Sequence, residues 1–245
     1  MEFSSLGLGL AALVALYVLA VEPWWGKRAY AALERRRESD PRALVRFYGQ
    51  GMAVWWPLAG IALLSVLISP GVAPADLGLG LAGTSWGTLA GMLVGAAAAG
   101  AVLYKFTPNS LAPGQAAVSA MLPRTPRERW AAVGLSVTAG VCEEIVFRGL
   151  FIAVGVSLGL ELWAAAAVSL AVFSFAHLYQ GLRGMLLVTL VGLALTSLYL
   201  STGSLLVPIV MHILIDLRAL LITPRPEAAR EPGQEEREVV GAGAR

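Results

Sequence analysis

The chain has 245 residues, of which 57% are hydrophobic and only 14% are charged, and its mean hydropathy is +0.71. Soluble domains carry about 25% charged residues, so this composition excludes an ordinary soluble domain and indicates a polytopic membrane domain. The net charge of +2 is too small to indicate a nucleic-acid partner, and a single cysteine, Cys142, excludes an intrachain disulfide.

The first apolar run, from Phe3 to Val21, is long enough to cross a bilayer. Glu2 is the only charged side chain before it, so we interpret the run as a retained helix and not as a signal peptide. Trp24 and Trp25 follow it, and such aromatic residues are typical of the headgroup region.

A polar segment follows, from Gly26 to Gln50, with seven lysine or arginine residues against three acidic ones. Because basic loops remain in the cytoplasm, the segment is predicted to be cytoplasmic and the N-terminus external. A further possibility is that part of it forms an interfacial helix on anionic lipid.

Two more spans are predicted, from Met52 to Ser69 and from Ser85 to Tyr104. The loop between them, residues 71–84, has no lysine or arginine, which indicates an external position. Lys105 and Arg124 belong to the next loop, which is therefore predicted to be cytoplasmic.

The fourth predicted span runs from Glu128 towards Gly159 and is preceded by Thr125-Pro126, a typical helix start. At about 1.5 Å per residue it is longer than a hydrocarbon core of about 30 Å. We therefore expect it to tilt, or to break near Gly149 or Gly155.

Three spans complete the chain, from Glu161 to Leu178, from Met185 to Leu200 and from Leu205 to Ile222. Pro208 is expected to kink the last one and free a carbonyl. The charged, proline-containing tail from Thr223 to Arg245 is predicted to be disordered.

The predicted fold is an all-α, polytopic membrane helical bundle of about seven transmembrane helices, with a catalytic core formed by spans four to seven. The C-terminus would then be cytoplasmic. Three regions are expected: an N-terminal transmembrane region with its basic segment, a membrane core, and the tail, at residues 1–125, 126–222 and 223–245.

Three charged side chains interrupt the fourth span, namely Glu143, Glu144 and Arg148. Each charge at mid-membrane costs about 2.5–3.5 kcal/mol or more, so such residues persist only where they are paired, hydrated or functional. Glu144 and Arg148 are spaced i,i+4 and share a helix face, whereas Glu143 is turned about 100° away and lacks that partner.

Only two histidines occur, His177 and His212, and each lies in an apolar helix within an i,i+4 pair, with Phe173 and Asp216 respectively. Because polar groups in membrane helices face the bundle interior, these side chains are expected to converge with the glutamates in a buried, wet site. There a carboxylate can take a proton from water while imidazoles orient the water or hold a metal.

Each feature also has a purely structural interpretation. A histidine can be a packing hydrogen bonder, Glu144 with Arg148 a structural ion pair, and Asp216 a group that fixes a tautomer. Taken together, these interpretations require five polar or charged residues to be placed independently, and at a cost, on membrane helices that could meet. A functional site is therefore favoured over five separate structural roles.

The three motifs Glu143-Glu144-x-x-x-Arg148, Phe173-x-x-x-His177 and His212-x-x-x-Asp216 resemble those of the CAAX-protease and bacteriocin-processing (CPBP, Abi) intramembrane proteases. The resemblance covers about Thr125 to Leu220. It implies an integral, multi-pass hydrolase of a prokaryotic cell membrane, with a cavity open to the cytoplasm, acting on a membrane-associated protein or peptide.

The resemblance also implies residue roles. Glu143 would be the general base and His177 would help to hold the water. His212 and Asp216 would face the substrate carbonyl and stabilise the oxyanion, and Arg148 would pair with Glu144. The family commonly has Asn where this chain has Asp216. Because an ionised carboxylate cannot donate a hydrogen bond, Asp216 is expected to be protonated, to orient His212, or to help bind a metal.

The cofactor is left open between none and a divalent metal such as Zn²⁺, for which Glu143, His177 and His212 are the candidate ligands. The sequence lacks the His-Glu-x-x-His helix that would make metal the default. Two other functions remain alternatives, a proton-coupled transporter and a non-catalytic membrane scaffold or immunity protein. The oligomeric state is not predicted.

Overall fold

The computed structural model describes residues 1–80, 85, 87, 90–91, 94–95 and 116–222, to which all structural statements refer. Most of the predicted third span, Lys105 and the tail from Thr223 lie outside these residues. The described chain is helical apart from one antiparallel bridge between Glu2 and Gly71, so the predicted all-α class is confirmed.

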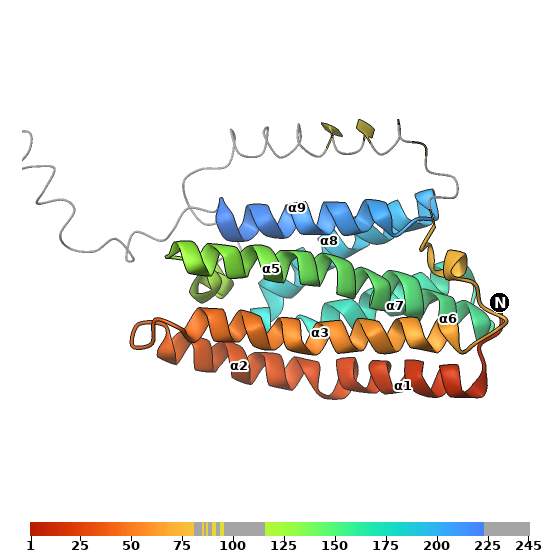
Figure 1. Ribbon diagram of the computed structural model, residues 1–245, viewed down its shortest axis with the longest axis horizontal. Coiled ribbons are helices and arrows are strands. Elements are labelled where there is room, and N and C mark those ends of the chain that lie inside the picture. Colours follow the sequence, from red (N-terminus) through yellow and green to blue (C-terminus); the bar gives the residue numbers. More distant parts are fainter. Residues whose placement is uncertain (81–84, 86, 88–89, 92–93, 96–115, 223–245) are drawn as a thin grey trace, which may run out of the picture.

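The long helices lie side by side in one bundle, and the N-terminus lies at the end opposite the last turn of α2 (Figure 1). The α-helices are α1 (Ser5–Ala20), α2 (Glu22–Arg36), α3 (Ala43–Leu67), α5 (Pro126–Glu143), α6 (Ile152–Ser157), α7 (Leu162–Ala176), α8 (Gly181–Thr202) and α9 (Leu206–Leu221). The remaining helical segments are η1 (Pro74–Leu77), η2 (Ala116–Met121), the π-helical η3 (Glu144–Phe151) and η4 (Leu178–Gln180).

Helices α1 and α2 follow one another with a bend of 44°, and α3 returns beside both. Tyr30 and Leu33 of α2 are buried against the bundle, so α2 packs as part of the bundle and is not a separate surface helix. Helix α3 begins at Ala43, nine residues before the predicted start of span two. Leu44 and Tyr48 are buried, so the first part of α3 has an apolar face although its sequence is basic. This apolar face explains why the helix starts earlier.

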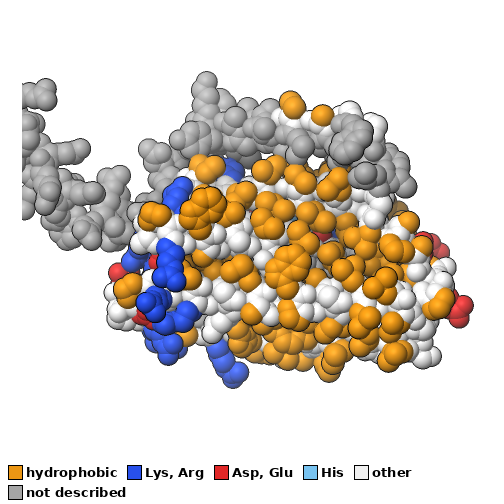
Figure 2. Space-filling view, viewed as in Figure 1, with side chains coloured by type: hydrophobic (Ala, Val, Ile, Leu, Met, Phe, Trp, Pro, Cys, Tyr) orange, Lys and Arg blue, Asp and Glu red, His pale blue; other side chains and the backbone are white. Residues whose placement is uncertain are grey.

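Apolar side chains cover the middle of the bundle, and lysines and arginines gather at the end where α2 ends and α5 begins (Figure 2). By length and composition, two helices of the described chain can cross a membrane, Ala43–Leu67 and Leu178–Thr202, with a third if α1 and α2 form one bent span. The predicted total of about seven spans therefore stays a prediction.

The predicted start of the fourth span is confirmed. Pro126 begins α5, the side-chain oxygen of Thr125 accepts a hydrogen bond from the Glu128 N–H, and the Glu128 carboxylate accepts one from the Thr125 N–H. The α-helix was expected to break near Gly149 or Gly155. It instead passes into the π-helical segment η3 at Glu144, and η3 includes Gly149. The wider turn changes the pattern of backbone hydrogen bonds. Within it, the Phe147 carbonyl accepts a hydrogen bond of 2.6 Å from the Ser169 hydroxyl.

The expected kink at Pro208 is wrong. Helix α9 begins at Leu206, so Pro208 occupies its first turn. A proline in the first turn removes an N–H that would have no partner within the helix, so the helix continues without interruption.

A buried ion pair joins the N-terminal helices to the start of α5. The Arg37 guanidinium binds both carboxylate oxygens of Glu128, at 2.8 and 2.9 Å, and also donates to the carbonyls of Ala120 and Leu122. The side chains of Arg37 and Glu128 are only 6% and 2% exposed. Buried charges of this kind are tolerated because every strong donor has an acceptor.

We predict that Arg37→Ala lowers the free energy of unfolding by about 3–5 kcal/mol, because Glu128 would remain buried without its cation. Thermal or denaturant unfolding in detergent micelles measures this change. Arg124→Ala is the matched control, since it removes an exposed Arg–Glu pair, with Glu38, between the same two regions. Equal losses for the two variants would contradict the assignment.

Candidate active site

Arg148 is fully buried at the centre of the bundle and holds four neighbours. It donates to the Glu144 carboxylate at 2.8 Å, to the Thr196 hydroxyl at 3.3 Å and to the Gly192 carbonyl at 2.9 Å. Its guanidinium carbon lies 4.5 Å from the centre of the Phe173 ring. The predicted pairing of Glu144 with Arg148 is therefore present, and Arg148 also connects η3 to α7 and α8.

Glu144 contacts His212 as well, a contact that the sequence did not reveal. The His212 Nδ1 lies 2.7 Å from Glu144 Oε1, the same oxygen that accepts from Arg148. Because the carboxylate accepts, Nδ1 carries the proton. The other ring nitrogen, Nε2, lies 3.9 Å from Asp216 Oδ2, which is an ionic contact and too long for a hydrogen bond.

A glycine makes the contact between α5 and α9 possible. A Cβ placed on Gly140 would lie 2.4 Å from the Ile213 side chain, 3.0 Å from its backbone nitrogen and 3.2 Å from the Ile209 carbonyl. Only glycine allows this close approach of two backbones. The approach places His212, one residue before Ile213, against Glu144.

Glu143 differs from Glu144 in having no partner. Its side chain is buried, and Oε2 has no hydrogen bond to any residue that the structure describes. The carboxylate nevertheless lies within electrostatic range of His212 and Asp216. Oε2 of Glu144 is likewise buried without a partner. The two glutamates differ because Oε1 of Glu144 accepts from Arg148 and contacts His212, whereas the Glu143 carboxylate has no such pair among the described residues.

His177 ends α7, and its ring lies 4.6 Å from that of Phe173. Nδ1 lies 2.9 Å from the Phe173 carbonyl, which can only accept, so Nδ1 carries the proton and Nε2 presents a lone pair. Phe173 also packs against Phe147 at 5.1 Å. Because α7 returns antiparallel to the α5–η3 helix, the residue one turn after Phe173 is expected at the level of the residue one turn before Phe147, which is Glu143.

Solvent reaches the site from one side. Asp216 keeps 29% of its side chain exposed and His177 is half-buried, whereas Glu144 is fully buried and His212 is 8% exposed at its side chain. Asp216 lies one turn after His212 on α9, in the direction of the basic end of the bundle. The arrangement is a buried carboxylate–imidazole site whose solvent-facing side is turned towards that end.

The candidate metal ligands do not gather into a metal site. Within the described ranges, no three His, Cys, Asp or Glu side chains are arranged to hold an ion. The Nδ1 atoms of His177 and His212 are both committed to other acceptors. These hydrogen bonds leave Nε2 of each ring as the atom that could ligate, but the trio Glu143, His177 and His212 is not gathered around a common point.

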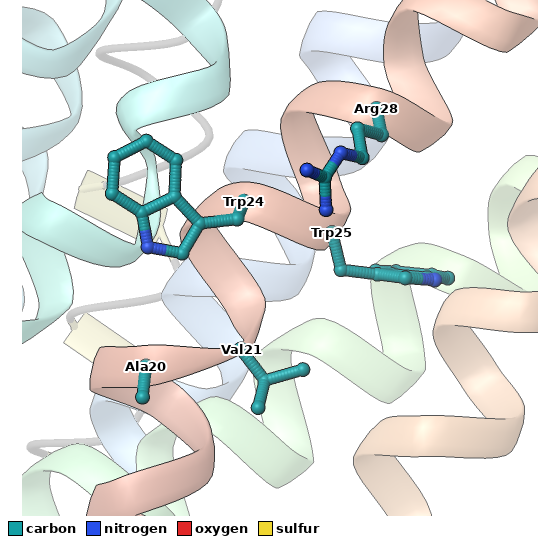
Figure 3. Close-up of a pocket in the computed structure, with 5 residues that line it drawn as sticks. All are labelled: Ala20, Val21, Trp24, Trp25 and Arg28. Atoms are coloured by element: carbon teal, nitrogen blue, oxygen red, sulfur yellow. The ribbon is translucent and has the colours of Figure 1, made fainter.

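A surface hollow of about 440 Å³ lies elsewhere, at the bend between α1 and α2. Its lining includes Trp24 and Trp25, which project in different directions from the helix, together with Arg28 (Figure 3). No predicted catalytic residue lines it. Its exposed indole and guanidinium groups are typical of a protein surface at lipid headgroups.

A family model matches the part of the chain that contains these residues. Residues 125–218 match the family model described as type II CAAX prenyl endopeptidase Rce1-like. The matched segment is similar to CAAX intramembrane proteases. It contains all seven residues of the three motifs and excludes the helices α1 to α3. Neither the curated proteins nor the solved structures include a match to this chain.

The matched segment also contains supporting residues that the motifs do not include. Thr196 and Gly192 hold Arg148, and Ser169 pairs with the Phe147 carbonyl. A polar residue on an otherwise apolar helix is a signal that could have pointed to Thr196 and Ser169. Nothing in the sequence distinguishes the Gly192 carbonyl from others on α8.

We predict that Gly140→Ala destabilises the protein by about 1–3 kcal/mol, because the added methyl group would push α9 away from α5. The matched control is Gly60→Ala on α3, where an added Cβ would meet nothing within 4 Å. Unfolding of both variants in the same detergent provides the measurement. Equal stability of Gly140→Ala and the wild type would show that α9 does not depend on this approach.

Proposed function

We propose that this protein is a membrane-embedded endopeptidase that hydrolyses a peptide bond of a membrane-associated protein or peptide. The observation that carries the proposal is the division of the glutamate pair. Oε1 of Glu144 is neutralised by Arg148 and His212, whereas within the described residues no side chain pairs with the Glu143 carboxylate. A free carboxylate in a site that solvent enters is the group expected to activate water.

In the proposed first step, the attacking water donates one hydrogen bond to Glu143 and the other to His177 Nε2. The hydrogen bond from His177 Nδ1 to the Phe173 carbonyl fixes the tautomer that leaves this lone pair available. Glu143 takes a proton while the water oxygen bonds to the carbonyl carbon. When the tetrahedral intermediate collapses, the C–N bond breaks and the proton moves from Glu143 to the leaving nitrogen.

The role of Asp216 follows from its position beside His212 Nε2. Glu144 on one side and Asp216 on the other both favour the doubly protonated, cationic form of His212. A cationic His212 can donate from Nε2 to the oxyanion, which a neutral ring with its proton on Nδ1 cannot do. We propose that Asp216 orients and stabilises His212 and does not itself contact the oxyanion.

The basic end of the bundle is proposed to be cytoplasmic. Exposed arginines of α2 and of the α5 start lie at that end, and the N-terminus lies at the other. The site would then open to the cytoplasm in a prokaryotic cell membrane, with the N-terminus outside. The matched model is named for prenyl endopeptidases. We propose a membrane-associated substrate, and comparison of prenylated and unmodified peptides would define it.

We predict that Glu143→Gln lowers kcat by at least about 100-fold, because the amide cannot accept the proton from water. Hydrolysis of a peptide library by protein in liposomes, read by mass spectrometry, measures this. Glu161→Gln, which alters an exposed carboxylate at the start of α7, is the matched control. Full activity of Glu143→Gln would exclude the mechanism, whereas proton flux without hydrolysis would favour a transporter. Neither hydrolysis nor proton flux in the wild type would favour a scaffold.

We predict that hydrolysis does not require a divalent metal, because the candidate ligands are not arranged around a common point. The protein would be treated with a chelator, its metal content measured by mass spectrometry, and its activity compared before and after. Retained activity with less than one metal ion per ten molecules is the expected result. Loss of activity that Zn²⁺ restores would contradict it.

A further inference from the structure

Tyr179 lies directly beside the proposed catalytic centre, although none of the three motifs includes it. It belongs to the short helix η4, which follows His177, and its ring lies 6.0 Å from the His177 ring with the planes tilted by 31°. On its other side, the ring of Tyr30 on α2 lies 6.1 Å away, and Gly26 of the same helix faces the Tyr179 ring. Tyr179 is therefore held between α2 and the site.

The hydroxyl of Tyr179 is available as a donor. Gln180 Nε2 donates to it at 3.1 Å, so the oxygen acts as an acceptor in that bond. Across the described part of the chain, no acceptor is recorded for the Tyr179 O–H itself. The charged groups that act on the hydroxyl are Glu143 of α5, Asp216 of α9 and Glu22 of α2.

The proposed reaction lacks a donor that Tyr179 can supply. A tetrahedral oxyanion needs hydrogen-bond donors placed where its charge develops, and commonly more than one. His212 Nε2 is one candidate, but its neighbour Asp216 is a carboxylate that cannot donate while ionised. Arg148 is occupied by Glu144, Thr196 and the Gly192 carbonyl. In the part of the chain that the structure describes, Tyr179 is a donor beside His177 that these contacts leave available.

We propose that the Tyr179 hydroxyl donates a hydrogen bond to the oxyanion of the tetrahedral intermediate, together with His212. The proton stays on the phenol oxygen, so the hydroxyl contributes by binding charge and takes no part in proton transfer. This inference rests on the proposed peptidase function. It adds a catalytic residue from the turn after the second motif, and it assigns α2 the task of holding that residue in place.

The first test compares Tyr179→Phe with the wild type on a peptide that the wild type hydrolyses. We expect kcat to fall by about 100-fold, as for the loss of one oxyanion donor, while KM changes less than about twofold. Tyr30→Phe, which removes the neighbouring hydroxyl and keeps its ring, is the matched control and should leave kcat unchanged. An unchanged kcat for Tyr179→Phe, or an equal fall for Tyr30→Phe, would overturn the proposal.

The second test measures binding and does not depend on turnover. A peptide phosphinate mimics the tetrahedral intermediate, and its affinity should fall with Tyr179→Phe by about the same factor as kcat. Tyr30→Phe, which keeps its ring, should leave the affinity for the phosphinate unchanged. An unchanged affinity in Tyr179→Phe would overturn the proposal. A wild type that neither hydrolyses peptides nor binds the phosphinate would instead overturn the proposed function.

Discussion

The ion pair between Arg148 and Glu144 is the interaction on which the arrangement of the core depends. Both side chains are buried, so each charge must be compensated within the bundle. Compensation draws in Thr196 and Gly192 from α8, Phe173 from α7 and His212 from α9. The helices that pack around this arginine are thereby held at the depth and rotation that bring the three motifs together.

Two local features of the backbone make that arrangement possible. The wider turn from Glu144 begins at the glutamate pair, and π-helical turns of this kind are frequent at functional sites. Gly140, one turn earlier, lets α9 approach closely enough for His212 to reach Glu144. The two neighbouring glutamates therefore differ, because Glu144 is paired with residues of η3 and α9 and the buried Glu143 carboxylate is not.

The helical class, the start of α5 and the Glu144–Arg148 pair could be predicted because each depends on neighbours in sequence: composition, a capping motif and i,i+4 spacing. The contact of His212 with Glu144 could not, since it depends on how closely α5 and α9 approach. Hydropathy does not locate the start of a helix to within one turn. For this reason the sequence predicted neither the start of the π-helical turn at Glu144 nor the place of Pro208 in the first turn of α9. The roles of Glu143, His177 and Asp216 remain predictions.

The pairing of Arg37 with Glu128 bears on how this protein could be divided. Arg37 lies outside the segment that matches the family model, whereas Glu128 stands in the first turn of that segment. A fragment beginning near Thr125 would lose the cation but keep the buried carboxylate. Exchanging the first three helices with those of a relative would succeed only if the incoming helices carried an arginine that reaches the same place. The two parts of the chain are therefore matched to each other by a buried charge pair.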